Sequence, residues 1–326
     1  MIQQKKIIRI NASALKNASC LRRLWLDVIE GYKPQKNGND IEYGQSFHKF
    51  TRALSEGKDL PSAMQEAHEH FNNTPMYIVK SGQWSKNWLN IGHLTMTCHD
   101  FYTKIWSQPK QMGFELLREN EIPLTEKQFS IPIYSDSEYD VLLQGTIDLI
   151  GRIDGGAYVF GDYKTTTFWD KEAFFLPYKM STQLATYTYA LRYHADHYPE
   201  SIIGRMLDNG RRLGCFIYGV FLSKDKPSEF IRSDVWFYPQ QWLDEYEMSL
   251  QFLVKRLLNH TKLVDELYMD RIDSLPVKEG LLNGACRGEF GMCKYFNACA
   301  SPDDRSFDAI LRGDFIRQEY KPLREK

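Results

Sequence analysis

Two apolar, β-type segments near the middle of the chain constrain its fold more than any other feature. They occupy residues 141–153 and 157–166, and they flank Asp154-Gly155-Gly156, which is a strong turn signal. Their apolar residues are typical of strands that are buried on both faces. The pattern predicts an antiparallel hairpin in the interior of an α/β domain.

Three charged residues interrupt this apolar pattern. A turn centred on Gly155 places Asp148 opposite Asp162, and directly opposite residues share a face. Lys164 shares that face because side chains alternate along a strand. A tight two-residue turn at Gly155-Gly156 would instead direct Asp162 to the other face. With the longer loop, two carboxylates and one ammonium project from one spot.

Paired carboxylates repel each other unless a cation lies between them. Oxygen ligands on strands suit Mg²⁺ or Mn²⁺, and Lys164 can orient a water that attacks phosphorus. The alternative is a polar hairpin with solvated charges. Unpaired charges are costly between apolar neighbours, which favours a metal site over that alternative.

Three motifs follow one another in the chain: G-x-x-D at 145–148, D-x-K at 162–164 and Q-x-x-x-Y at 183–187. This order resembles the PD-(D/E)xK nuclease superfamily, and most narrowly its RecB-type branch, which includes CRISPR adaptation nucleases and the AddB and Dna2 nuclease domains. The resemblance implies an α/β, restriction-endonuclease-like fold with a central mixed sheet flanked by helices. A helical N-terminal wall and a metal-stapled C-terminus complete the expected architecture.

The resemblance also implies roles for individual residues. Lys164 would position the attacking water, while Gln183 and Tyr187 would hold the DNA phosphate and steady that lysine. It also implies four metal ligands: His48, Asp148, Asp162 and the backbone carbonyl of Tyr163.

Two of the site assignments depend on the family pattern. His48 follows Gly44 in a G-x-x-x-H context on an expected helix at residues 42–55. A lone helical histidine is otherwise structural or exposed. Glu126 fits a family glutamate on the preceding strand, and a polar strand-edge residue is an equal interpretation.

Four of the six cysteines form an unusual pattern. Cys286, Cys293 and Cys299 cluster near the C-terminus, and Cys20 is the best candidate for a fourth thiolate. In the resembled branch, one cysteine before the core and three after it hold a [4Fe–4S] cluster. Four thiolates also suit Zn²⁺, and the spacing alone does not decide between the two. Either group would join the first helix to the tail.

The composition bounds the class of protein and its partners. The chain has 326 residues, 43% of them hydrophobic, and a net charge of −1, so a nuclease must concentrate its basic residues locally. No apolar run is long enough to span a membrane, and no secretory signal is recognisable, so we expect a cytoplasmic protein. Candidate DNA-contacting cations are Arg22, Arg23, Lys171, Lys179, Arg205, Arg211 and Arg212.

Several segments are expected to be helical. They are residues 13–31 with Ser13 as N-cap, residues 60–71 and 84–106, and residues from 181 or 182 to 197. Phe168 and Trp169 follow the D-x-K motif and are candidates for stacking on unpaired bases, with core packing expected for at least one of them.

We expect three regions: a helical N-terminal region at 1–115 with Cys20 and His48, a nuclease core at 116–270, and a C-terminal cysteine cluster and tail at 271–326. The predicted function is a Mg²⁺- or Mn²⁺-dependent DNA exonuclease that acts on ends or single strands in recombination, repair or replication, with a helicase or recombinase as a candidate partner. The alternatives are a nucleic-acid-binding assembly module with a vestigial site and a site-specific endonuclease.

Overall fold

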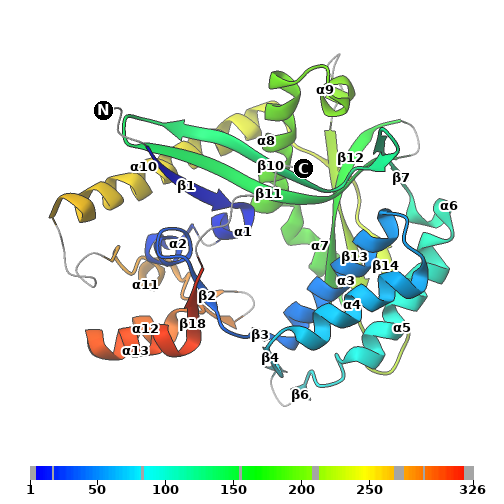
Figure 1. Cartoon of the computed structure of the whole chain (residues 1–326), viewed down its shortest axis with the longest axis horizontal. Helices are drawn as coiled ribbons and strands as arrows, with labels where there is room; N and C mark the ends of the chain where they lie inside the picture. The colour runs from blue at the N-terminus through cyan, green and yellow to red at the C-terminus, as the bar shows by residue number, and fades with distance from the viewer. Residues whose placement is uncertain are drawn as a thin grey trace.

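The computed structural model describes residues 5–16, 18–81, 84–153, 156–207, 213–267, 275–288 and 291–318. Within them a central mixed sheet is flanked by helices on both faces (Figure 1). This architecture confirms the predicted restriction-endonuclease-like α/β fold. No helix in these ranges is long and apolar enough to cross a membrane.

The central sheet mixes parallel and antiparallel pairs. Its strand order is β1-β11-β12-β13-β14, where β1 pairs with β11 and β12 with β13 in parallel, and the other neighbours are antiparallel. β10 also pairs with β11. The bounds are β1 (Lys6–Asn11), β10 (Thr125–Ser135), β11 (Tyr139–Arg152), β12 (Tyr158–Thr166), β13 (Leu213–Phe221) and β14 (Glu229–Arg232). Short strands β7 (Glu115–Leu116) and β15 (Trp236–Phe237) extend the edges.

The predicted hairpin is present with the predicted register. β11 and β12 pair from Arg152↔Tyr158 to Leu149↔Gly161, so Asp148 and Asp162 follow immediately after the last pair. Beyond that pair β11 continues between β1 and β10, whereas β12 continues along β13. Figure 1 shows the two halves of the sheet diverging in different directions. We call the point of divergence, at Asp148 and Asp162, the fork.

Apolar residues on the two faces of β12 bury it between two groups of helices. Val159 packs with α3 (Asn39–Ser55), α4 (Leu60–Asn73) and α5 (Ile91–Phe101), while the adjacent Phe160 packs with α8 (Thr182–His197) and α9 (Ile202–Leu207). The long helix α10 (Gln240–Leu267) covers β10 and the β1 side of the sheet. The fork is therefore approached by α3 from one face and α8 from the other.

The N-terminal segment differs from the prediction. Residues 6–11 form the sheet strand β1, and the single helix expected at 13–31 is two helices, α1 (Ala12–Leu15) and α2 (Leu21–Val28). Asn11, not Ser13, caps α1, since its side chain accepts a hydrogen bond from the amide of Ala14 at 2.7 Å. Cys20 has an extended backbone at the N-cap of α2. The expected helix is interrupted there because α1 packs on the fork, whereas α2 packs on the C-terminal segment.

A second expected helix begins later than predicted. Residues 84–85 form a strand, β6 (Trp84–Ser85), and α5 begins at Ile91 because the Asn90 side chain caps it through the amide of His93 at 3.1 Å. The predicted end at residue 106 is confirmed, although the last five residues form a π-helical turn, η1 (Tyr102–Trp106). The helices expected at 42–55, 60–71 and 182–197 are confirmed with small differences at their ends.

The C-terminal segment folds back onto the N-terminal one. Strand β18 (Phe315–Arg317) pairs with β2 (Tyr32–Pro34) after helices α12 (Phe296–Cys299) and α13 (Asp304–Asp314). The Tyr295 hydroxyl lies 2.8 Å from Asp27 Oδ1 and 3.0 Å from the carbonyl of Tyr32. The two ends of the chain are thus joined by direct contacts.

Candidate active site

Asp148 ends the regular pairing of β11 and β12. Its Oδ2 accepts a hydrogen bond from the backbone amide of Tyr163 at 2.9 Å, in place of a main-chain acceptor. The same oxygen lies 3.2 Å from His48 Nδ1. Burial raises the pKa of the Asp148 carboxyl, but His48, Lys164 and the Tyr163 amide together hold it below its usual value. Asp148 is therefore kept as a carboxylate at the fork.

His48 reaches the fork from α3 because the helix lies very close to β12. A Cβ on Gly44, one turn before His48, would lie 2.9 Å from Thr165 Oγ1, so a larger residue would push the helix away. Burial lowers the pKa of the imidazole, but the neighbouring Asp148 has the larger effect in the opposite direction, so the pKa is raised to about 9. The G-x-x-x-H pattern thus has a steric cause here.

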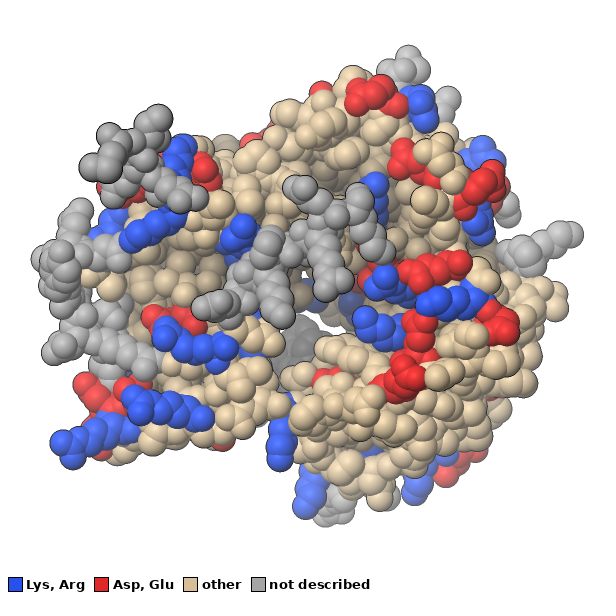
Figure 2. Space-filling view, in the orientation of Figure 1, with Lys and Arg blue, Asp and Glu red and all other residues tan. Residues whose placement is uncertain are grey.

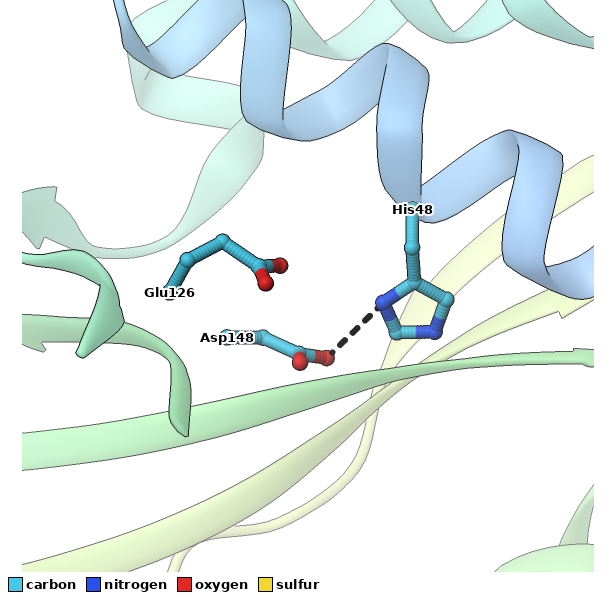
Figure 3. A group of neighbouring side chains, drawn as sticks. All are labelled: His48, Glu126 and Asp148. Atoms are coloured by element: carbon cyan, nitrogen blue, oxygen red, sulfur yellow. Dashed lines mark ion pairs between the residues drawn. The ribbon is translucent and has the colours of Figure 1, made fainter. Parts of the chain in front are cut away.

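Glu126 completes a set of three side chains that can bind a metal. One ligand atom each from His48, Glu126 and Asp148 lies within 4.8 Å of the others, and Figure 3 shows the three side chains converging between α3 and the strands. Glu126 sits in β10 between the pairs Thr125↔Leu149 and Lys127↔Ile147, beside Asp148. Burial and the Asp148 charge raise the pKa of its carboxyl. The structure brings Glu126 to the site that the sequence only weakly indicated.

The backbone of Glu126 is unusual. Its φ is +49°, a left-handed conformation that non-glycine residues rarely adopt inside a strand. Such backbone strain tends to be retained where it places a functional side chain. No sequence signal marks this conformation.

Asp162 lies on the α8 side of the fork and is 2% exposed. Its Oδ1 accepts a hydrogen bond from Gln183 Nε2 at 2.9 Å, and its Oδ2 faces the ammonium of Lys164 without a hydrogen bond of regular geometry. Burial raises the Asp162 pKa; the Asp148 charge raises it further, and Lys164 only partly offsets this. Asp162 is not part of the three-residue group, and it faces Lys164 instead.

Lys164 retains its charge at this half-buried position. Burial lowers the pKa of its ammonium, but the Asp162 and Asp148 carboxylates raise it above the usual value. Lys164 thus adds a fixed positive charge beside the two aspartates.

Gln183 and Tyr187 extend the site along α8. The Gln183 Nε2 lies 2.8 Å from the Tyr187 hydroxyl and 2.9 Å from Asp162, so Gln183 contacts the aspartate and Tyr187 contacts Gln183. Ser181 caps the helix, because its side chain accepts a hydrogen bond from the amide of Leu184. Gly145 allows Tyr187 and Phe129 to pack over β11, because a Cβ on it would lie 2.5 Å from the Phe129 ring.

Lys16 is a site residue that sequence analysis missed. Its Nζ donates a hydrogen bond to Gln183 Oε1 at 2.8 Å from the break between α1 and α2. Although its side chain is largely exposed, the crowded ammonium has a pKa lowered to about 8, by burial first and by the Lys164 charge second. A lysine ammonium is only a donor, so it orients the Gln183 carbonyl outward and the Gln183 amide toward Asp162.

The sequence matches the model of the PD-(D/E)XK nuclease superfamily over residues 9–299, from β1 to Cys299. The chain belongs to the PD-(D/E)XK nuclease superfamily. A crystal structure described as a "putative exonuclease" from Eubacterium rectale is similar at 12% sequence identity and a TM-score of 0.42, covering 77% of this chain and 80% of that one. A comparison with curated proteins finds no match.

Membership explains the donor set at the fork. PD-(D/E)XK nucleases use divalent metals, and the His48, Glu126 and Asp148 group offers two carboxylates and one imidazole. Burial and the neighbouring Asp148 charge raise the pKa of Asp162 in spite of Lys164, and a divalent ion would offset both. The side chains present therefore fit a divalent ion.

A separate part of this nuclease chain gathers the four clustered cysteines. Cys20, Cys286, Cys293 and Cys299 line one cavity of about 60 Å³ between α2 and the C-terminal segment. Arg22, Arg23 and Lys278 line it as well. Cys98 and Cys215 are instead buried in the apolar cores.

Figure 2 shows one face of the nuclease with a hollow near its centre, between the part built on α3–α5 and the part built on α2, α12 and α13. Lysine and arginine side chains lie on both sides of this hollow. Of the predicted DNA-contacting cations, Arg22 and Arg23 line the cysteine cavity and Lys171 is paired with Glu229. Arg211 and Arg212 lie outside the described residues.

Proposed function

We propose that the protein is a Mg²⁺- or Mn²⁺-dependent DNA exonuclease of the RecB-type branch, which hydrolyses phosphodiester bonds at ends or in single strands. One observation carries this proposal: His48, Glu126 and Asp148 converge within 4.8 Å at the fork, beside the Asp162–Lys164 pair. The proposed setting is DNA recombination, repair or replication, with a helicase or recombinase as partner and the cytoplasm as the compartment.

The residues proposed to hold the metal are His48, Asp148, Asp162 and the carbonyl of Tyr163, with Glu126 as a further carboxylate from β10. The ion would polarise the scissile phosphate and lower the pKa of a bound water. Its charge would also offset the burial of the carboxylates, which is the reason that Asp162 has a raised pKa without it.

The remaining side chains would act on the substrate. Lys164 would orient the attacking water and offset the charge that develops on the phosphate, because its ammonium stays protonated beside Asp162. Gln183 would hold Asp162 and the Tyr187 hydroxyl in fixed positions, and Tyr187 would lie along the DNA backbone.

We further propose that the cysteine cavity holds a [4Fe–4S] cluster. Cys20, Cys286, Cys293 and Cys299 line one cavity of about 60 Å³, and one cysteine before the core with three after it is the order that the resembled branch uses for such a cluster. The basic side chains around the cavity would offset its negative charge. Four thiolates also suit Zn²⁺, and metal analysis distinguishes the two.

The test is incubation of the purified protein with end-labelled linear single-stranded, blunt double-stranded and circular single-stranded DNA. We expect degradation of linear DNA with Mg²⁺ or Mn²⁺, and none with EDTA. Asp162→Ala should lose at least about a thousandfold in rate, while Asp225→Ala, an exposed aspartate outside the site, should cleave normally. Cleavage of circular DNA at one sequence would indicate an endonuclease, and binding without cleavage would indicate a vestigial site.

A further inference from the structure

The connection from Lys164 to Gln183 carries an exposed apolar surface. β12 ends at Thr166, then α7 (Lys171–Phe175) and η2 (Leu176–Met180) follow before α8. Figure 1 places α7 near the centre of the molecule, below α8. Four large apolar side chains of this connection are mostly in solvent: Phe168 (50% exposed), Trp169 (88%), Leu176 (60%) and Met180 (69%). Both aromatic residues are thus exposed, which contradicts the expectation that one of them packs in the core.

Both ends of this connection are attached to the site. An extended chain spans at most about 3.6 Å per residue, so Phe168 lies within about 14 Å of Lys164 and Met180 within about 11 Å of Gln183, measured between Cα atoms. Tyr178 in η2 is close enough to Lys164 to affect its pKa. Phe168 and Met180, the first and last of the four exposed side chains, are therefore held within these distances of two residues that contact Asp162.

Packing holds this connection in place. The rings of Phe174 and Phe175 lie 5.2 Å and 5.8 Å from the ring of Phe221 on β13, in edge-to-face contacts. The amide of Phe168 donates to Thr166 Oγ1 at 3.0 Å, and Asp170 caps α7 through the amide of Ala173 at 3.0 Å. The exposed side chains are thus presented by a fixed backbone, which lowers the entropy lost when a ligand binds.

The chemistry of this surface fits unpaired bases. Bases expose apolar faces only when they are not stacked in a duplex, and aromatic side chains bind those faces with little regard to sequence. The adjoining cations match the backbone of the same strand: the ammonium groups of Lys164 and Lys16 lie at the fork, and exposed Lys179 lies on η2. A protein partner would need a larger apolar patch than these four side chains offer.

We propose that Phe168, Trp169, Leu176 and Met180 form a platform that stacks the unpaired bases of a DNA strand whose phosphate lies at the fork. This inference rests on the proposed nuclease function and specifies its substrate: a single strand, or an end that has been unpaired. Duplex DNA would bind through its backbone alone, without using the platform.

The test measures binding in the cleavage-inactive Asp162→Ala background, with a labelled oligo(dT) and a blunt duplex of equal length. Trp169→Ala should weaken binding of oligo(dT) about tenfold and leave binding of the duplex unchanged. Trp169→Phe should restore most of the affinity, because it keeps a ring. The control is Phe252→Ala on α10, another exposed aromatic residue (66%) far along the chain, which should alter neither affinity.

Tryptophan fluorescence gives a readout that does not depend on cleavage. Oligo(dT) should quench emission in the Asp162→Ala protein, and the quenching should fall in the additional Trp169→Phe variant. Equal losses for oligo(dT) and duplex, or no loss for either, would overturn the platform. A wild-type protein that cleaves DNA while Trp169→Ala behaves as the control would leave the nuclease intact and reject the platform. A protein that cleaves nothing but shows the Trp169 quenching would do the reverse.

Discussion

The Lys16 ammonium lies 2.8 Å from the Gln183 carbonyl oxygen, although 167 positions separate the two residues in the chain. Through this contact the first helix fixes the amide that holds Asp162. Without Lys16, the Gln183 carbonyl oxygen loses this donor, and only the contacts of Nε2 with Asp162 and Tyr187 hold the amide. The contact therefore makes a residue outside the recognised motifs part of the active site.

Replacing Lys16 should slow cleavage without removing the metal ligands. We expect Lys16→Met to lower kcat roughly tenfold to a hundredfold, the effect of losing one hydrogen bond to a charged group, with little change in the Mn²⁺ dissociation constant. Steady-state kinetics on linear DNA and Mn²⁺ titration provide the measurement.

Lys16→Arg separates positioning from packing, because arginine donates the same bond and stays charged. It should recover most of kcat. Because the lysine pKa is about 8, the wild-type rate should also decline as pH rises through that value, while the arginine variant should not. Equal kcat in wild type and Lys16→Met would remove Lys16 from the site.

Metal binding should release a proton from His48. In the metal-free protein the imidazole has a pKa of about 9 and is charged at pH 7.5, whereas a metal-bound imidazole is neutral. We therefore expect Mg²⁺ or Mn²⁺ to release more protons from the wild type than from His48→Asn, measured with a pH indicator in weak buffer. The difference should vanish above pH 10.

The same group links stability to pH in EDTA. A histidine whose folded-state pKa is raised stabilises the fold fully below its unfolded value, near 6.5, and loses this contribution as pH rises through about 9. The wild type should therefore lose more stability than His48→Asn between pH 6 and pH 10, as followed by urea unfolding. Parallel curves for the two proteins would argue against the His48–Asp148 contact.

Gly44 provides a steric test of the same histidine. Gly44→Ala introduces a Cβ 2.9 Å from Thr165 Oγ1, which should shift α3 and weaken metal binding several-fold. Thr165→Ala removes the opposing oxygen, so the double variant should regain much of the affinity. A double-mutant cycle in Mn²⁺ affinity measures this coupling. Additive losses would mean that the Gly44–Thr165 approach does not position His48.

Local patterns in the sequence were enough to predict the hairpin and its register. The turn at Gly155 and the apolar runs beside it specify neighbouring residues, and Ser181 marks the start of α8 in the same local way. The fork forms because β11 and β12 separate, β11 to pair with β1 and β12 to pair with β13. This pairing depends on contacts between distant segments, so no single segment of the sequence predicts it.

The site residues that were missed or only weakly indicated share this physical origin. Lys16 contacts Gln183, which is 167 positions away in the chain. Glu126 reaches the site through a left-handed backbone conformation that a glutamate does not predict. The prediction of a single helix at 13–31 was wrong for the same reason, because α1 and α2 pack on different parts of the molecule. The region boundaries at 115 and 270 and the catalytic roles stay predictions.

Loss of the cysteine-bound group should separate cofactor content from folding. Protein purified without oxygen should be brown, with absorption near roughly 400 nm from thiolate-ligated iron and sulfide. Cys20→Ser should lose this absorption and its iron, because Cys20 lines the cavity with the other three cysteines. Cys98→Ala, a core cysteine outside the cavity, should retain both.

The Cys20→Ser protein should nevertheless stay folded. β2 still pairs with β18, and Tyr295 still contacts Asp27, so α2 and the tail remain joined without the group. We expect a lower Tm from the loss of bound metal, with DNA cleavage by the fork retained. Metal analysis with one zinc and no iron would reject the iron–sulfur cluster, but a metal would still join α2 to the C-terminal segment. A Cys20→Ser variant with unchanged metal content and Tm would show that Cys20 is a buried thiol and that the cavity does not bind the group through it.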